Sequence, residues 1–304
     1  MARIKNITEL PDDEFRVIGA HEPGAAGKKK LSPWWWIAAS AAVIALALLL
    51  LLLPKAKPDG VEAGVFEGGN AAWSVKVEPL VEPFGSPVDT AAGPYVEKIQ
   101  ETVNDIVFDI YIPNNCTPVL SVGNPTAELR KGLLAFQAAD IRADNRKILG
   151  AFVLKGEPLA WGLSKKGYCA IIDGKITVGV SENSPLFEEA TEKGGYFFRQ
   201  YPMVDNGRLC ESELKGKSVR KAICDRAGQI FVAVTTTEES MHDFAQALVD
   251  MGVKNAVYLV GSRYSFGWWR PTPDDEPELF GLDDHHESYK NETYIVWLEV
   301  FPMK

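Results

Sequence analysis

The stretch from Gln200 to Ser262 decides the fold of this 304-residue chain. It contains QYPMVDNGRL (200–209), RKA (220–222), the apolar run GQIFVAV (228–234) and NAVYLVGS (255–262). An amphipathic segment with helical spacing separates the last two runs. The order predicts a strand, a helix and a second strand that ends in a turn of small residues. Proteins that mix helices and strands commonly place a ligand at such a turn.

Apolar periodicity predicts further elements on both sides of this stretch. Alternation predicts strands at 106–112, 148–154, 168–172, 175–180, 196–200, 218–224, 229–235, 255–260 and 294–301, with Asp173-Gly174 as a hairpin turn. Helical spacing predicts helices at 95–104, 126–143 and 184–193, and Thr237 is the predicted N-cap of a helix that Gly252 ends. We therefore expect an α+β fold, with a mixed, strongly bent sheet and a few packed helices, preceded by a single transmembrane helix.

The transmembrane prediction rests on the run from Trp34 to Leu53, which contains no charged residue and has Ser40 as its only polar member. A buried core helix would show a polar stripe, and a signal peptide would end in a cleavage site rather than in Pro54 and Lys55. The sequence therefore predicts a mostly disordered cytoplasmic tail (1–32), a membrane-spanning helix (33–54), a stalk (55–94) and a domain (95–304).

Six lysines and arginines precede the apolar run, whereas only Lys55 and Lys57 follow it closely, which places the main domain outside the cytoplasm, as in a bacterial periplasm. All four cysteines follow the run, in agreement with an oxidising compartment. Cys210 and Cys224 flank a charged loop that a disulfide could close. Together with Cys116 and Cys169 they allow three full sets of disulfide pairs. The sequence does not choose among these sets, nor between them and four free thiols.

Composition and spacing exclude several classes of function. The net charge of −9 argues against nucleic acid as a partner. No Cys/His spacing indicates zinc, and the acidic loop Asp283-Asp284-His285-His286 is more typical of a solvated segment than of a metal site. We expect neither a metal nor another cofactor.

Three segments, taken in order, resemble the phosphodiester glycosidase family of N-acetylglucosamine-1-phosphodiester alpha-N-acetylglucosaminidase-like domains. Gly150-Ala151-Phe152 resembles the family's early Asn-Gly-Gly-Phe turn, and Arg220-Lys221-Ala222 resembles its Arg-x-Ala strand. Residues 256–262 resemble its late Asn-x-Leu-Asp-Gly-Gly turn. The resemblance covers residues 148–297 and indicates a divergent, bacterial-type member. It implies a sugar-1-phosphodiester or a related envelope glycan as the ligand.

The departures from the family pattern leave the activity open. Leu149 and Tyr258 replace asparagines, Val260 replaces the late aspartate, and Ser262 replaces the second glycine of the turn. Valine cannot transfer a proton or stabilise positive charge, whereas glycoside cleavage usually needs two carboxylates. The chain is therefore either a hydrolase or an inactive module that binds an envelope glycan or a protein partner.

The resemblance and the residue types together give a set of candidate site residues. Arg220 is the candidate catalytic residue, because a guanidinium can grip a phosphodiester bidentately. The aromatic loop that follows the late turn adds faces for sugar rings. The candidate substrate-binding residues are Gln200, Tyr201, Asn206, Tyr258, Gly261, Ser262, Arg263 and Trp268. Each of them also has an ordinary structural interpretation, in a turn, at a strand end or over a sheet end.

Overall fold

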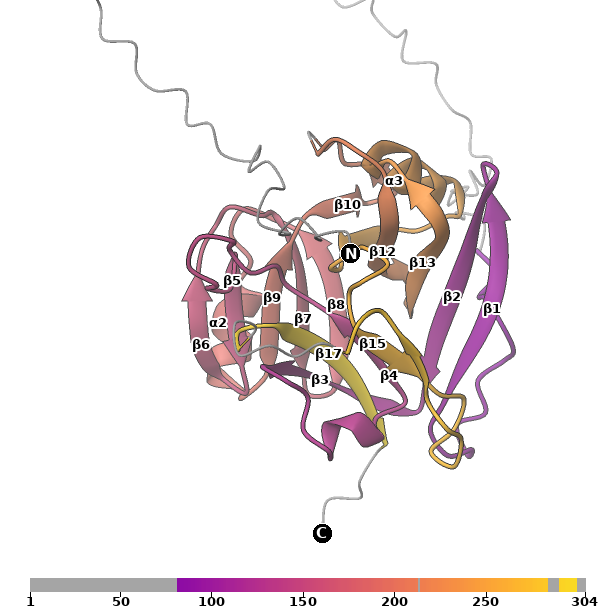
Figure 1. Cartoon of the computed structure of the whole chain (residues 1–304), viewed down its shortest axis with the longest axis horizontal. Helices are drawn as coiled ribbons and strands as arrows, with labels where there is room; N and C mark the ends of the chain where they lie inside the picture. The colour runs from indigo at the N-terminus through magenta and orange to yellow at the C-terminus, as the bar shows by residue number, and fades with distance from the viewer. Residues whose placement is uncertain (1–80, 213, 284–289, 300–304) are drawn as a thin grey trace, which may run out of the picture. The chain divides into compact units, whose positions relative to one another are not determined.

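The computed structural model describes residues 81–212, 214–283 and 290–299, and strands far outnumber helices in them (Figure 1). The strands form three sheets, and the pairings within them are antiparallel. The expectation of an α+β fold with a mixed sheet is therefore wrong, and the described residues form a mostly-β fold.

The first sheet contains seven strands. Their order is β1 (Tyr95–Val103), β2 (Ile106–Asn114), β13 (Gln229–Glu239), β12 (Ser218–Arg226), β14 (Asn255–Tyr258), β10 (Pro202–Asp205) and β11 (Arg208–Leu209). Helix α3 (Met241–Asp250) packs on one face through Phe244, Ala245 and Leu248, as its periodicity predicts. Its N-cap is Ser240, whose hydroxyl accepts the Asp243 N–H, and not the predicted Thr237.

The other two sheets contain five strands each. One has the order β16 (Glu278–Phe280), β15 (Gly267–Trp269), β4 (Leu134–Gln137), β17 (Thr293–Glu299) and β3 (Cys116–Val122). The other has the order β6 (Glu157–Trp161), β5 (Ala151–Leu154), β9 (Tyr196–Gln200), β7 (Gly167–Ile172) and β8 (Lys175–Val180). Helix α2 (Leu186–Glu192) packs on this third sheet, and a 3-10 turn (Leu129–Lys131) precedes β4.

The predicted helices at 95–104 and 126–143 account for much of the error in fold class. Residues 95–103 form β1, which pairs along its whole length with β2 through a tight turn at Asn104 and Asp105. Residues 134–137 form β4, which lies between β15 and β17, two strands more than 130 positions later in the chain. Apolar residues spaced like a helix face can also lie on a strand, and here long-range pairing overrides the local pattern.

Several local predictions are confirmed. The hairpin of β7 and β8 turns at Asp173 and Gly174, which have φ values of 51° and 73°. Helix α2 is followed by Gly194, and β12 pairs with β13 through Ala227 and Gly228. These turns require positive φ, and glycine adopts it at little cost.

A central core lies where the three sheets meet. It includes Ile223 and Val257 from the first sheet, Phe136 from the second, and Phe152 and Phe198 from the third, all of them buried. A second core lies between the first sheet and α3. Because the three sheets share one core, the ends of their strands are held in fixed positions relative to one another.

The described part of the predicted stalk packs against the first sheet. Phe84 is buried in the core under α3, and its ring meets Phe231 edge-on at 5.2 Å between centroids. Its backbone N–H and C=O both bond to the side-chain amide of Gln229.

No helix among the described residues is both long and apolar enough to span a membrane. The predicted tail, the predicted membrane-spanning helix and residues 55–80 of the predicted stalk lie outside the described residues. The four cysteines are described, and all are free thiols, so the structure contains no Cys210–Cys224 disulfide. Cys169 and Cys224 are buried, and burial raises the pKa of both thiols.

Candidate functional site

The end of β14 brings four distant segments of the chain together. The backbone N–H of Tyr258 donates to Tyr201 O at 2.9 Å, and that of Val260 donates to Gln137 O at 3.1 Å. The N–H of Ser262 donates to Val219 O at 2.8 Å. Residues of the first and second sheets, and the residue that follows β9 of the third, therefore meet at the turn that the sequence predicts as a ligand-binding position.

Arg220 lies at this meeting point and is only 6% exposed. Its Nε donates to Glu239 O at 2.8 Å, its Nη2 to Gly216 O at 2.7 Å and its Nη1 to the Tyr258 hydroxyl at 3.3 Å. None of these acceptors is charged, and no described carboxylate forms an ion pair with Arg220. Charged side chains are seldom buried this far without a counter-charge, and among the described residues Arg220 has none in an ion pair.

Tyr258 joins Arg220 to the glycine turn. Burial raises the pKa of its hydroxyl, and the neighbouring Arg220 opposes that rise. A Cβ at Gly261 would lie 2.0 Å from the Tyr258 hydroxyl oxygen and 2.7 Å from Val219 O. Only glycine fits there without displacing its neighbours, so Arg220 and Gly261 both lie next to the Tyr258 hydroxyl.

A second cation lies next to this group. Lys165 is 3% exposed, forms an ion pair with Asp140 and donates to Gln200 Oε1 at 2.5 Å. Its Nζ lies 3.9 Å from the centre of the Tyr201 ring. The charge of Asp140 also acts on Tyr258, which connects the two halves of the cluster. We call Asp140, Lys165, Gln200, Tyr201, Arg220 and Tyr258 the polar cluster.

Sequence reasoning missed Lys165 and Asp140. Lys165 lies in a short loop beside Lys166, which is exposed and pairs with Glu182. Nothing in the local pattern separates the buried lysine from the exposed one. Only the contacts made in the folded chain, where Lys165 meets Gln200 of β9 and Asp140, make the difference.

Other candidate residues lie outside the polar cluster. Asn206 lies at the opposite end of β14, where its N–H donates to Asn255 Oδ1. Arg263 is exposed and forms an ion pair with Glu238. Trp268 is 1% exposed, packs beside Phe266 and donates from its indole to Gly132 O, so it offers no face to a ligand.

Lys221, next to Arg220, points to the other side of β12. It is buried, and its Nζ lies 2.5 Å from the hydroxyl and 3.2 Å from the carbonyl oxygen of Ser265. Burial lowers the pKa of Lys221 to about 7. Its ammonium also lies 5.3 Å from the centre of the Phe280 ring.

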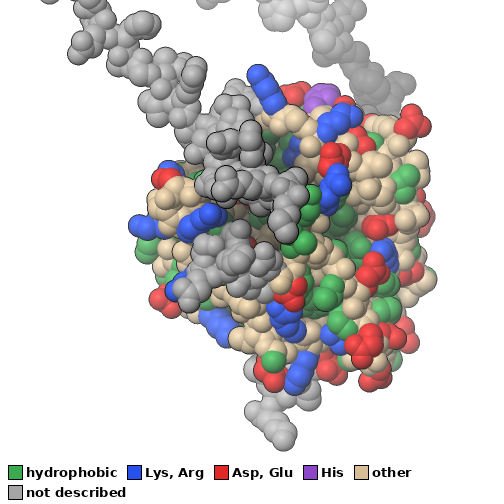
Figure 2. Space-filling view, viewed as in Figure 1, with side chains coloured by type: hydrophobic (Ala, Val, Ile, Leu, Met, Phe, Trp, Pro, Cys, Tyr) green, Lys and Arg blue, Asp and Glu red, His purple; other side chains and the backbone are tan. Residues whose placement is uncertain are grey.

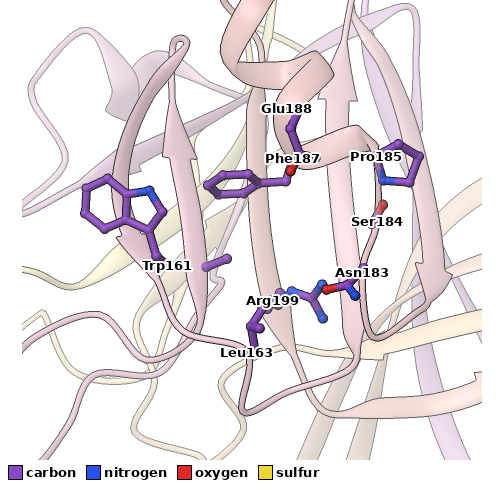
Figure 3. A pocket seen from close by; sticks show the side chains of 9 residues that line it. Trp161, Leu163, Asn183, Ser184, Pro185, Phe187, Glu188 and Arg199 are labelled. Atoms are coloured by element: carbon purple, nitrogen blue, oxygen red, sulfur yellow. The ribbon is translucent and has the colours of Figure 1, made fainter.

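The described residues also form a cavity of about 480 Å³ on the outer side of the third sheet (Figure 3). It is lined by Ala151, Trp161, Leu163, Asn183, Ser184, Pro185, Phe187, Glu188 and Arg199. Successive residues of a strand point to opposite faces, so Arg199 lies in this cavity whereas Gln200 lies in the polar cluster. The cavity and the polar cluster are therefore separated by β9.

The described residues contain no group of three or more His, Cys, Asp or Glu side chains that could hold a metal ion. Asp284, His285 and His286 of the acidic loop lie outside them. The described member of that loop, Asp283, forms an ion pair with Arg130.

Comparisons with known proteins give a weak likeness in fold. No protein-family model and no curated protein sequence matches the chain. One similar structure is the catalytic domain of zebrafish N-acetylglucosamine-1-phosphodiester alpha-N-acetylglucosaminidase, auto-inhibited by its pro-peptide. Its TM-score is 0.48 at 13% identity, over 72% of this chain and 86% of that one. A hypothetical protein from Synechocystis gives 0.45 at 12% identity, over 68% of this chain and 62% of that one. The fold thus weakly resembles that of a glycosidase catalytic domain, and the arguments below rest on this chain's own residues.

Proposed function

We propose that this domain binds an anionic glycan, and in particular a sugar phosphodiester, at the polar cluster. The observation that supports this most is the environment of Arg220, whose guanidinium is buried among neutral acceptors. A phosphodiester brings the negative charge that Arg220 lacks, and a guanidinium is well suited to bind it. The rings of Tyr201 and Tyr258 are apolar surfaces for the sugar.

The acidic surface elsewhere on the domain limits where an anionic ligand can bind. In Figure 2, acidic side chains predominate on the side where β1 and β2 lie in Figure 1. An anionic ligand is repelled from such a surface, and the chain as a whole has a net charge of −9. A local cluster that contains buried cations is therefore needed to hold a phosphate.

Recognition without turnover agrees best with the residues at this position. Hydrolysis of a glycosidic bond usually requires two carboxylates that flank it, one acting as the acid and the other as base or nucleophile. Asp140 is a carboxylate of the cluster, and Lys165 holds it in an ion pair. Val260 occupies the place where the phosphodiester glycosidase pattern has an aspartate. The expectation that the domain lies outside the cytoplasm rests on the sequence alone.

The test measures binding and turnover together. The full-length chain is titrated with a hexose-1-phosphate methyl diester in a calorimeter, and with the uncharged methyl hexoside as the control ligand. Released hexose is assayed in the same samples. We expect the diester to bind, the methyl hexoside to bind much more weakly, and no hexose to be released. Arg220→Lys is expected to weaken diester binding about tenfold, because lysine cannot contact phosphate bidentately.

The matched control is Arg208→Lys, which changes an exposed arginine of β11, the strand at the far edge of the first sheet. It should leave the affinity unchanged. Equal affinities for the diester and the methyl hexoside would contradict the proposal. Release of hexose that Asp140→Asn abolishes would instead establish the hydrolase alternative.

A further inference from the structure

The cavity on the third sheet has an unusual rim. Gly162 packs directly on Gly150, and a Cβ at position 162 would lie 3.2 Å from the Gly150 Cα. This close approach fixes the chain between the two large apolar residues that flank Gly162. Trp161 is 66% exposed and Leu163 is 64% exposed, and both line the cavity (Figure 3). Large apolar side chains so far out of the core are a common feature of binding surfaces.

Arg199 forms part of the cavity wall and is 2% exposed. Its Nη1 donates to the carbonyl oxygens of Lys165 and Ser181, and its Nη2 donates to that of Glu182, each at 2.8 Å. Its Nε has no hydrogen-bond partner among the described residues. The Nε atom has almost no accessible surface, so its N–H does not reach a ligand, and the three bonds fix the side chain of Arg199 as part of the cavity wall.

The other lining residues identify the chemistry of that ligand. Trp161 and Phe187 are flat aromatic faces, Asn183 and Ser184 are polar groups on the side away from Trp161, and Glu188 lies next to Phe187 (Figure 3). A purely apolar ligand would offer no hydrogen bond to Asn183 and Glu188, two exposed polar side chains of the wall. An anionic ligand would lie near the Glu188 carboxylate, which already acts on the charge of Arg199. A neutral ligand with both C–H faces and oxygen acceptors satisfies every group.

A sugar ring has this combination. Its C–H groups pack on an aromatic face, while its hydroxyls both donate and accept hydrogen bonds. The volume of about 480 Å³ also lies in the range of small-molecule sites. We propose that this cavity binds one ring of a neutral oligosaccharide, stacked on Trp161, with hydroxyls that bond to the side chains of Asn183 and Glu188. This site lies on the opposite side of β9 from the polar cluster and does not depend on the phosphodiester proposal.

The test uses the full-length chain and three uncharged probes, namely maltotriose, cellotriose and mannotriose, each titrated in a calorimeter. We expect saturable binding of at least one of them. Trp161→Ala should weaken that binding at least tenfold, and Asn183→Ala should weaken it by a smaller factor. Both side chains are exposed, so the variants should melt at the same temperature as the parent chain.

Leu279→Ala is the matched control, because Leu279 is a 56% exposed apolar residue on β16 of the second sheet. It should leave oligosaccharide binding unchanged. The proposal is wrong if none of the three probes binds, or if Trp161→Ala binds as tightly as the parent chain. Binding of an apolar dye in the cavity, with no displacement by any of the sugars, would also overturn it.

Discussion

Single residues beside the polar cluster show how closely the site is packed. Gly261 is the clearest case, because an added methyl group would meet the Tyr258 hydroxyl at 2.0 Å and Val219 O at 2.7 Å. We expect Gly261→Ala to lower the free energy of unfolding by about 1–3 kcal/mol, as overpacking does elsewhere. Denaturant unfolding measures it.

The same clash can be tested by removing one of its partners. In a Tyr258→Phe background the hydroxyl is absent, so Gly261→Ala should cost less than in the parent chain. Gly93→Ala is the control, because nothing lies within 4 Å of a Cβ at Gly93. Equal costs for Gly261→Ala in both backgrounds would show that the hydroxyl does not restrict this position.

Lys221 makes the stability of the domain depend on pH. Its pKa is about 7 in the folded chain and returns to its usual 10.5 on unfolding. Between these values the unfolded chain binds more protons, so the free energy of unfolding rises with pH by up to about 1.4 kcal/mol per unit. Lys221→Met removes this contribution. The variant should gain most over the parent chain at pH 7 and lose that advantage towards pH 10.

Denaturant unfolding at several pH values checks this prediction. Lys166→Met changes an exposed lysine and serves as the control, since it should show the same small effect at each pH. A constant difference between Lys221→Met and the parent chain from pH 7 to pH 10 would contradict a lowered pKa at Lys221.

At the scale of elements, the residue that the sequence predicts as the N-cap of α3 is not the residue that caps it. Thr237 has the residue type and position of an N-cap, but it lies within β13, and its hydroxyl donates to the Glu239 carboxylate. Ser240 caps the helix instead. We expect Ser240→Ala to lower the free energy of unfolding by about 1 kcal/mol, and Thr237→Ala to change it much less. Thermal or denaturant unfolding of the two variants measures this difference, and equal losses would contradict the assignment.

Elements with strong local signals were predicted well. The hairpin of β7 and β8, the short α2 and the apolar face of α3 all follow from turn residues or periodicity within a few positions. The strands β1 and β4 were predicted as helices, because their partners decide their conformation and the local sequence does not show those partners. For β4 these partners, β15 and β17, lie far along the chain.

At the scale of the whole molecule, the segment before β1 belongs to the core of the first sheet. Phe84 packs on Phe231, and the Arg226 guanidinium lies 4.0 Å from the centre of the Phe84 ring. We expect Phe84→Ala to lower the free energy of unfolding by about 3 kcal/mol, since it leaves a cavity beneath α3. Val88→Ala, at a 50% exposed position in the same segment, should change it by less than about 0.5 kcal/mol.

Denaturant unfolding compares these two variants, and an equal effect would show that the segment contributes no packing. A fragment that begins at residue 95 lacks Phe84 altogether. It should therefore unfold at a lower denaturant concentration than a fragment that begins at residue 78.

The sequence by itself determined the features that depend on near neighbours. These are the turns that need positive φ, the amphipathic face of α3, and the small-residue turn at Gly261 beside the β12 and β14 strands. It also placed Gln200, Tyr201, Arg220, Tyr258 and Gly261 among the candidate residues, and the structure brings these five together.

Only the tertiary structure decided the sheet order, the mostly-β class and the membership of the site. Lys165 and Asp140 join the polar cluster, while Asn206 and Trp268 lie elsewhere, because strands from three sheets share one core and fix where each loop passes. The same packing buries Arg220 in the first sheet and Arg199 in the third. Neither side chain forms an ion pair with a carboxylate among the described residues. Burial and partnership are properties of neighbours in space, and neighbours in the chain do not specify them.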